Sequence, residues 1–474
     1  MAKKKVALVL SGGSSLGSYI AGALDELMRA FADSGDMYEI DIITGASAGA
    51  TTGALIAHGL SYRGGDTSLH NTWVDQVDIV DLLDPNLPQG EPPSLLSSRR
   101  LQELAMQELT WKDGANEGQR ATFRAAELSF AMTITNTTPL SYTSRIHQPA
   151  SRRAEPYIEA RNAEQESFAL SSTKPTDPMW QRIGEVARAS AAIPFVFPLV
   201  RLARRANDTN HYAQPPNFEG ERQFWYCDGG TFNNLPIDLA WYHHERRYGP
   251  NLKDRVMVVV NPWRRSTSPL TTDPYRPGLL QYGLGLVSAA MNESSAIQFQ
   301  NEVILPSIRA EGGANEGGGK AIPGLNRPPV ELLGNFALVM PRGEDSRLHG
   351  NHMQAMGAFL DRKFREYDFR RGAADARRAA EDVLEISYNA ERPEGFYEPD
   401  KDPNFQYDNS TYSGLGNIKS SRDPNRSVRE VFEEALNRRI DALVDAFNPP
   451  GPNMLSSHFV KQYVQGQLEG LWKQ

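Results

Sequence analysis

The sequence contains almost no cysteine and no long apolar run, and both shortages exclude classes of protein. Its single cysteine, Cys227, cannot form an internal disulfide and leaves no thiol cluster for zinc or iron–sulfur, so we expect a reducing compartment such as the cytoplasm. The longest nearly apolar stretch, residues 189–200, is interrupted by two prolines, whereas a membrane span needs ~20 apolar residues. Near the start of the chain the apolar run ends at glycines after five residues, which is too short for a signal peptide.

An excess of positive charge is also missing. The chain has 50 lysines and arginines against 58 aspartates and glutamates, and its net charge of −8 offers no general attraction to nucleic acid or anionic lipid. Any membrane contact must therefore be local and transient. Histidines, cysteines and carboxylates are not clustered at metal-ligand spacings, so we expect neither a metal nor a cofactor. The sequence does not indicate an oligomeric state.

What the first 60 residues do contain is an alternation of strands and helices. Residues 6–10 and 40–44 are predicted strands, and each is followed by a tight turn and a helix, at 18–32 and 50–57. Two such units in succession predict a parallel sheet with right-handed crossovers. The β-branched run at residues 255–260 suits a strand that is buried on both faces. We therefore predict a three-layer α/β/α fold with a mostly parallel sheet.

The pattern divides the chain into a core and an extension. We place the core at residues 1–265, with an insertion at about 61–120, and a mostly helical C-terminal extension at 266–474. Further core strands are predicted at Ala125–Ile134 and Phe224–Cys227. In the extension we expect helices and one long surface loop: helices at 279–301, 351–384 and 428–447, and the loop at 390–427.

The sharpest local motif is Gly45-Ala46-Ser47-Ala48-Gly49, which lies between a predicted strand and a predicted helix. A nucleophilic serine at such a position needs a sharp turn with little room beside it, so small residues must flank it. The helix N-terminus also favours the negative charge that develops on a serine alkoxide. A tight turn in which Ser47 only caps the helix explains the same residues.

A second glycine-containing loop, SGGSSLG at residues 11–17, also joins a strand to a helix. Glycines there let backbone N–H groups converge on an anion, either a nucleotide phosphate or the oxyanion of an acyl transfer. A P-loop would end in Gly-Lys-Ser/Thr, and Leu16-Gly17-Ser18 does not match it. A dinucleotide-binding loop matches only at Gly12 and Gly17, and a structural turn also remains an alternative.

The third motif, Cys227-Asp228-Gly229-Gly230, stands at the end of a predicted strand. An aspartate there, followed by two glycines, can leave the sheet and direct its carboxylate to the edge where Ser47 lies. An Asx-type turn would account for the motif without any catalytic role.

Together the three motifs resemble those of the patatin-like phospholipases, a family of lipid acyl hydrolases. The family has, in this order, a glycine-rich loop, a G-x-S-x-G serine and an aspartate in D-G-[Gly/Ala]. Three further stretches resemble the family near the third motif: residues 188–194, 197–198 and 234–236. The resemblance covers residues 5–262 and implies that Ser47 is the nucleophile and Asp228 the catalytic acid residue.

The first loop departs from the family pattern, because Ser14 replaces the third glycine and Leu16 replaces a basic residue. A serine still donates its backbone N–H, so the resemblance implies an oxyanion hole formed by Gly12, Gly13 and Ser14. Without the basic residue the loop lacks an anchor for phosphate head groups. Residues 367–375 resemble a segment that follows the core in some bacterial members, and a solvated helix face explains their charges equally well.

The resemblance implies a mechanism in which Asp228 takes the proton of Ser47 and the serine attacks an ester of a lipid. Activity would then stay flat as pH falls through ~6.5 and decline nearer the carboxylate range, shifted upward somewhat by burial. An esterase or thioesterase of the α/β-hydrolase type is an alternative, with His243 or His244 completing a triad that titrates near ~6.5. A second alternative is a lipid-binding relative that has lost efficient turnover.

Overall fold

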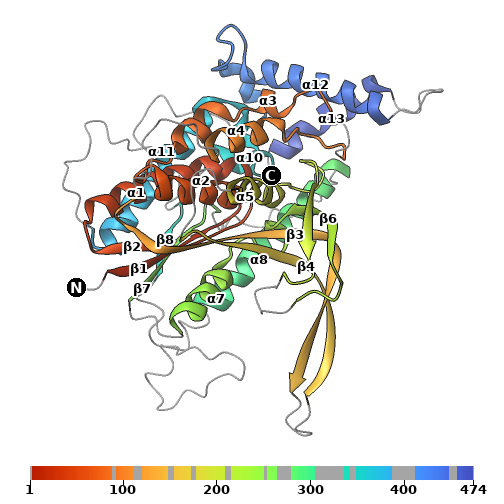
Figure 1. Cartoon of the computed structure of the whole chain (residues 1–474). Helices are drawn as coiled ribbons and strands as arrows, with labels where there is room; N and C mark the ends of the chain where they lie inside the picture. Colours follow the sequence, from red (N-terminus) through yellow and green to blue (C-terminus); the bar gives the residue numbers. More distant parts are fainter. Residues whose placement is uncertain are drawn as a thin grey trace.

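An eight-stranded sheet runs through the middle of the molecule and carries helices on both faces (Figure 1). This computed structural model describes residues 3–87, 92–109, 120–147, 154–171, 178–208, 215–249, 254–263, 279–304, 336–341, 348–386, 412–447 and 456–472. The strands are β1 (Lys4–Leu10), β2 (Tyr38–Gly45), β3 (Arg124–His147), β4 (Ala154–Ala169), β5 (Val200–Arg205), β6 (Glu221–Asp228), β7 (Arg255–Val260) and β8 (Phe336–Val339). Their order is β5-β6-β3-β2-β1-β7-β8, and β4 pairs with β3.

Most strands of this sheet run in one direction. Strand β1 pairs in parallel with β2 and β7, β2 pairs in parallel with β3, and β7 does so with β8. Strands β4 and β6 run antiparallel to β3. Side chains of β1 alternate between two apolar cores: Val6, Leu8 and Leu10 face one core, and Ala7 and Val9 face the other. The sheet is therefore buried on both faces, as predicted.

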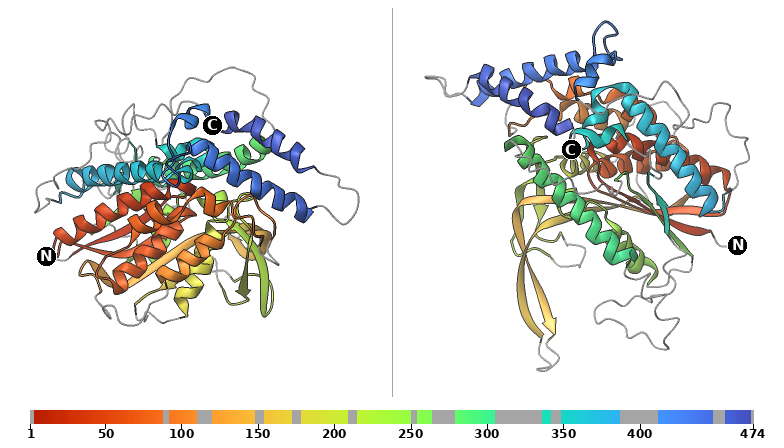
Figure 2. Two further views of the ribbon diagram at one scale, coloured as in Figure 1. Left: turned by 90° about the horizontal axis from the view of Figure 1, so that it is seen from above. Right: turned by 180° about the vertical axis from the view of Figure 1, so that it is seen from behind.

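The helices form the two outer layers. They are α1 (Gly17–Asp33), α2 (Ala48–Tyr62), α3 (Ile79–Leu82), α4 (Arg99–Leu109), α5 (Met179–Ser190), α6 (Gly230–Asn233), α7 (Ile237–Tyr248), α8 (Leu279–Phe299), α10 (His352–Ala355), α11 (Arg362–Asp382), α12 (Val428–Phe447) and α13 (Ser457–Trp472). Helices α1, α2 and α11 lie on one side of the sheet and α7 lies on the other (Figures 1 and 2). The predicted three-layer α/β/α fold is confirmed.

Strand β3 is much longer than the predicted strand Ala125–Ile134. Beyond Ile134 it leaves the parallel part of the sheet and forms a long antiparallel hairpin with β4, which extends from the body of the molecule (Figure 1). Many of the side chains of this hairpin are polar and exposed, so it lacks the apolar pattern of a buried strand. The prediction missed the hairpin for that reason.

The part of the chain beyond residue 265 contributes to the same body. Strand β8 extends the sheet beside β7, and helix α11 packs along α1. The backbones of these two helices touch, because a side chain at Gly22 would overlap the carbonyl oxygen of Phe369 and one at Gly372 that of Tyr19. The division at residue 265 remains a prediction.

Helix α11 corrects two predictions. It begins at Arg362, not at residue 351, because the Asp361 side chain caps it by accepting the Lys363 N–H at 3.0 Å. Its charges do not form a solvated face. Asp368 and Asp375 are buried; the Asp375 carboxylate accepts the Tyr19 hydroxyl at 2.9 Å. The sequence around Asp368 does not reveal this burial, because other segments cause it: the N–H groups of His349 and Gly350 donate to the Asp368 carboxylate at 2.8 Å, and α1 packs along the helix.

Two other regions complete the outer layer. Residues 390–411 of the predicted loop at 390–427 lie outside the described residues, and a short helical turn at Tyr412–Asn417 packs against α12. The predicted helix at 428–447 is confirmed as α12. No helix in the described ranges is both long and apolar enough to span a membrane.

Candidate active site

The sheet brings Ser47 and Asp228 to the same edge. Ser47 stands just beyond the end of β2, and Asp228 is the last residue of β6. Between them runs β3, where Met132 is in register with Gly45 and Ile134 with Asp228. The Ser47 hydroxyl donates a hydrogen bond to Asp228 Oδ2 at 2.5 Å. A bond this short holds the hydroxyl and the carboxyl group in direct contact, which is the geometry that a nucleophile and its base would need.

Ser47 occupies a sharp turn with a strained backbone. Its φ of 51° and ψ of −122° lie in a region that residues other than glycine rarely adopt, and α2 begins at the next residue. Gly49, in the first turn of α2, touches the backbone of the first loop: an added Cβ would overlap the carbonyl oxygens of Leu10 and Ser11. Gly45 is the last residue of β2, so both flanking glycines stand where strand and helix meet.

We expect Gly49→Ala to lower the free energy of unfolding by about 1–3 kcal/mol, because the new methyl group must displace backbone atoms. Gly283→Ala is the matched control, since nothing lies within 4 Å of the added Cβ in helix α8. Urea denaturation followed by circular dichroism measures both variants. Equal stability of the two would contradict the close contact at Gly49.

Asp228 is fully buried, and its protonation reflects that burial. Burial raises its pKa to about 7, although hydrogen bonds from the Ser47 hydroxyl and the Gly230 N–H oppose the shift. The Gly230 N–H lies 2.7 Å from Oδ1, and the Gly229 N–H donates to the Ser190 carbonyl oxygen at 3.1 Å. A carboxyl group with this pKa is poised to take and return a proton near neutral pH.

Ser190 links the two halves of this arrangement, and the sequence did not single it out. Its hydroxyl oxygen accepts the backbone N–H of Ser47 at 2.9 Å, while its carbonyl oxygen holds Gly229. It stands at the end of α5, within the stretch at residues 188–194 that resembles the family. The resemblance of this stretch to the family was the one signal that could have identified Ser190, because no local pattern distinguishes it from other serines at helix ends.

The first glycine loop lies directly beside Ser47, since an added Cβ at Gly12 would lie 3.0 Å from the Ser47 Cβ. The Gly12 N–H, however, donates to the Asn234 carbonyl oxygen at 3.0 Å, so it is not available to an oxyanion. Among the described residues, the N–H groups of Gly13 and Ser14 have no such partner. Of the three backbone N–H groups predicted to form an oxyanion hole, those of Gly13 and Ser14 therefore remain as candidates.

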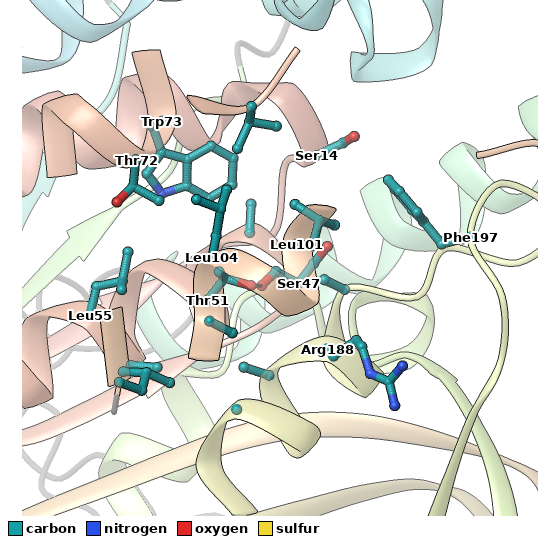
Figure 3. A pocket seen from close by; sticks show the side chains of 18 of the residues that line it. Ser14, Ser47, Thr51, Leu55, Thr72, Trp73, Leu101, Leu104, Arg188 and Phe197 are labelled. Carbon is teal, nitrogen blue, oxygen red and sulfur yellow. Dashed lines mark hydrogen bonds between the residues drawn. The ribbon is translucent and has the colours of Figure 1, made fainter. Parts of the chain in front are cut away.

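An apolar pocket opens at Ser47 (Figure 3). Ser14 and Ser47 line it together with residues of α2, α4 and α5, and most of its lining side chains are apolar. Leu101 and Leu104 of α4 come from the predicted insertion at about 61–120, which thereby contributes to the site. The pocket has the lining expected for a hydrocarbon chain.

The side chains that a triad or a metal site would need are engaged elsewhere. His243 lies 3.2 Å from the Ser167 hydroxyl of β4, and His244 accepts from Arg255 at the opposite edge of the sheet. In the described part of the chain no three His, Cys, Asp or Glu side chains form a metal-binding group. Cys227 is buried in β6, where burial raises its pKa to about 12.

Residues 8–241 match the family model described as patatin-like phospholipase. No curated protein matches the chain. Among solved structures, the crystal structure of VipD from Legionella pneumophila matches with 14% sequence identity and a TM-score of 0.30, covering 81% of this chain and 67% of VipD. A TM-score this low adds nothing to the fold derived above.

Proposed function

Residues 8–241 belong to the patatin-like phospholipase family, a family of lipid ester hydrolases, and from this premise we propose that the protein is a serine acyl hydrolase with a Ser47–Asp228 dyad. One observation carries the proposal: the 2.5 Å bond between Ser47 Oγ and Asp228 Oδ2 at the end of an apolar pocket. The substrate is a carboxylic ester of a lipid, whose acyl chain the pocket would hold. No metal or cofactor is needed for this chemistry.

The reaction proceeds in two halves. Asp228 Oδ2 accepts the proton of Ser47 Oγ as that oxygen forms a bond to the ester carbonyl carbon. The N–H groups of Gly13 and Ser14 donate to the oxyanion, the C–O bond to the leaving alcohol breaks, and Asp228 returns the proton to that oxygen. Water then loses a proton to Asp228, attacks the acyl-serine, and releases the acid and the Ser47 hydroxyl.

The energetics support this assignment of roles. The raised pKa of Asp228 narrows the gap between the base and the serine hydroxyl, which makes proton transfer less uphill than for an ordinary aspartate. The N-terminus of α2 lies at Ser47 and stabilises negative charge there. Each oxyanion donor contributes about 3 kcal/mol of transition-state stabilisation.

A fluorophosphonate tests the proposal against a lipid-binding protein without turnover. We expect one covalent adduct per chain, located by peptide mass spectrometry on Ser47, together with release of fatty acid from lipid esters. Reagent that labels another residue, or binding of lipid without any release of acid, would contradict it.

We also propose that the protein works in the cytoplasm and touches lipid surfaces transiently at the mouth of the pocket. Phe195 supports this contact, because its side chain is 73% exposed and its neighbours Ile193 and Phe197 line the pocket. A hydrogen bond holds the backbone of Phe195 in place, since the Leu95 N–H donates to the Phe195 carbonyl oxygen at 3.1 Å. A rigid loop that holds an aromatic ring in solvent beside a lipid site is typical of an interfacial anchor.

Phe195→Asp should therefore lower activity on lipid in vesicles by about tenfold, since a carboxylate replaces an apolar anchor at the lipid surface. Activity on a soluble short-chain ester serves as the internal reference in each variant. Met37→Asp is the matched control, because Met37 is 50% exposed at the opposite edge of the sheet. A loss of the same size in the control, or on the soluble ester, would count against an interfacial role.

A further inference from the structure

The first glycine loop, which carries the two candidate oxyanion donors, has a strained backbone. Ser14 has a φ of 49°, a left-handed conformation that residues other than glycine rarely adopt. One backbone hydrogen bond closes the turn, from the Leu16 N–H to the Gly13 carbonyl oxygen at 2.8 Å. A strained turn persists only where the surrounding structure holds it, so the contacts around this loop decide where its N–H groups point.

A segment more than 300 residues later in the chain packs against this loop. We call residues 348–360 the strap; it contains α10 and a short 3₁₀ turn on either side of it. The Ser14 hydroxyl lies 3.0 Å from the Met356 sulfur of the strap. The next hydroxyl oxygen of the loop, that of Ser15, accepts the Ala358 N–H at 3.1 Å. Two consecutive serines of the loop are therefore bonded to the strap.

A third contact joins the strap to the loop through Leu16. An added Cβ at Gly350 of the strap would lie 2.5 Å from the Leu16 side chain, and an added Cβ at Gly13 would lie 3.0 Å from the Leu16 Cβ. Leu16 is fully buried, so it packs between the strap and the residue that carries a candidate oxyanion donor. A displacement of the strap at Gly350 would therefore be transmitted to Gly13.

Asp368 of α11 holds the end of the strap that carries Gly350. Its carboxylate is fully buried and accepts the backbone N–H groups of His349 and Gly350, each at 2.8 Å. Burial raises the pKa of Asp368 to about 8, although these two N–H groups oppose the shift. One turn earlier on the same helix, Arg365 donates to the Phe359 carbonyl oxygen at 3.0 Å. Helix α11 therefore holds both ends of the strap.

We infer that Asp368 is a positioning residue for the reaction at Ser47. It fixes the strap, and the strap fixes the first glycine loop, so that the N–H groups of Gly13 and Ser14 face the developing oxyanion. The inference rests on the proposed function. Burying a carboxyl group is unfavourable unless its hydrogen bonds compensate, and those of Asp368 go to the strap. Asp368 does not line the pocket at Ser47, so its loss should affect the oxyanion and not the binding of an acyl chain.

Asp368→Asn tests the inference, because the amide keeps the size of the side chain but offers one acceptor oxygen to two N–H groups. The other N–H then faces an NH₂ group, which displaces the strap. We expect kcat for ester hydrolysis to fall by about 10²-fold, as when one oxyanion donor is lost, with KM nearly unchanged. Asp375→Asn is the matched control, since Asp375 is buried on the same helix and accepts the Tyr19 hydroxyl. It should keep the wild-type kcat.

Two inhibitors separate positioning from a general loss of structure. With a trifluoromethyl ketone, Ser47 Oγ bonds to the carbonyl carbon, its proton passes to Asp228, and the carbonyl oxygen becomes an oxyanion that needs the loop. An ether of the same chain length occupies the pocket and forms no oxyanion. Asp368→Asn should weaken inhibition by the ketone by about 10²-fold and leave inhibition by the ether nearly unchanged.

An unchanged kcat in Asp368→Asn, an equal loss of inhibition by ketone and ether, or the same fall in Asp375→Asn would overturn the inference. If circular dichroism shows Asp368→Asn to be unfolded, Gly350→Ala takes its place, because its methyl group would displace the Leu16 side chain. That variant must then show the selective loss of inhibition by the ketone, or the inference fails. A wild-type protein that neither cleaves esters nor reacts with the ketone would instead contradict the proposed function.

Discussion

Ser47→Ala is expected to lower kcat for lipid ester hydrolysis by about 10⁴-fold or more, the range found when a catalytic nucleophile is removed. Alanine keeps the Cβ and the backbone N–H that donates to Ser190, so the strained turn should persist. It loses the oxygen that lies 2.5 Å from Asp228 and forms the acyl-enzyme. Initial rates on a long-chain ester, with thermal unfolding as the check on folding, measure the effect.

The control for this substitution is Ser167→Ala, which removes an exposed hydroxyl that contacts His243. It should keep full activity and full labelling by a fluorophosphonate, whereas Ser47→Ala should lose both. Turnover above background in Ser47→Ala would remove Ser47 from the nucleophile's role. Loss of activity in Ser167→Ala would revive the histidine alternative.

Asp228→Asn should reduce kcat nearly as much, by about 10⁴-fold, because an amide cannot take the serine proton. The shape of the site should survive, since the asparagine oxygen can still accept the Gly230 N–H. Binding of a non-hydrolysable lipid should therefore change little while turnover disappears. Retention of more than a few per cent of wild-type kcat would show that another group acts as the base.

The pH dependence of the wild-type protein follows from the same residue. The base must be ionised, and its pKa of about 7 means that kcat/KM falls about tenfold per pH unit below that value. The sequence predicted a flat profile through ~6.5, which is wrong for this site because burial moves the carboxyl group into the range of histidine. A fall of kcat/KM near neutral pH therefore does not distinguish a Ser-Asp dyad from a Ser-Asp-His triad. His243→Ala does, and we expect it to retain wild-type activity.

Asp228→Asn should also change stability, in a direction that linkage fixes. The folded-state pKa lies above the unfolded value of 3.8, so between about pH 4 and 7 the folded state binds more protons. Stability due to this group is therefore lost as pH rises through that window. The asparagine variant should be more stable than wild type by a few kcal/mol at pH 8 and no more stable near pH 4. Urea denaturation of both proteins at both pH values measures the difference in stability. Asp368, whose pKa burial raises to about 8, contributes equally to both proteins and cancels in that difference.

The strand-end positions of Ser47 and Asp228 could be predicted from the sequence because each residue is marked by its immediate neighbours, and their roles as nucleophile and base remain predictions. A serine between small residues, after a buried strand and before a helix, has few conformations open to it. The two strand–turn–helix units then place that turn at the carboxyl edge of a parallel sheet. Asp228 is the last residue of β6, which runs antiparallel to β3, so the geometry of parallel sheets does not bring it to this edge. It lies near Ser47 because β3 continues past its pairing with β2 and holds Asp228 opposite Ile134. The place of the serine turn follows from local pattern, whereas the approach of Asp228 depends on the long β3 strand.

The burial and the hydrogen-bond partners of individual groups were decided by segments that are distant in the chain. Nothing in the sequence distinguishes the N–H of Gly12 from that of Gly13. In the fold the Gly12 N–H donates a hydrogen bond to the carbonyl oxygen of Asn234, more than 200 residues later in the chain. The Asp368 carboxylate looks solvated in the sequence, but in the fold it is buried and accepts the backbone N–H groups of His349 and Gly350. Periodicity reports which face of an element is apolar, but not what covers that face. Burial, hydrogen-bond partners and the pKa of Asp228 depend on that covering. The sequence by itself determined where the two candidate catalytic residues stand, at the ends of predicted strands, while only the tertiary structure decided which backbone donors beside Ser47 are already bonded to other residues.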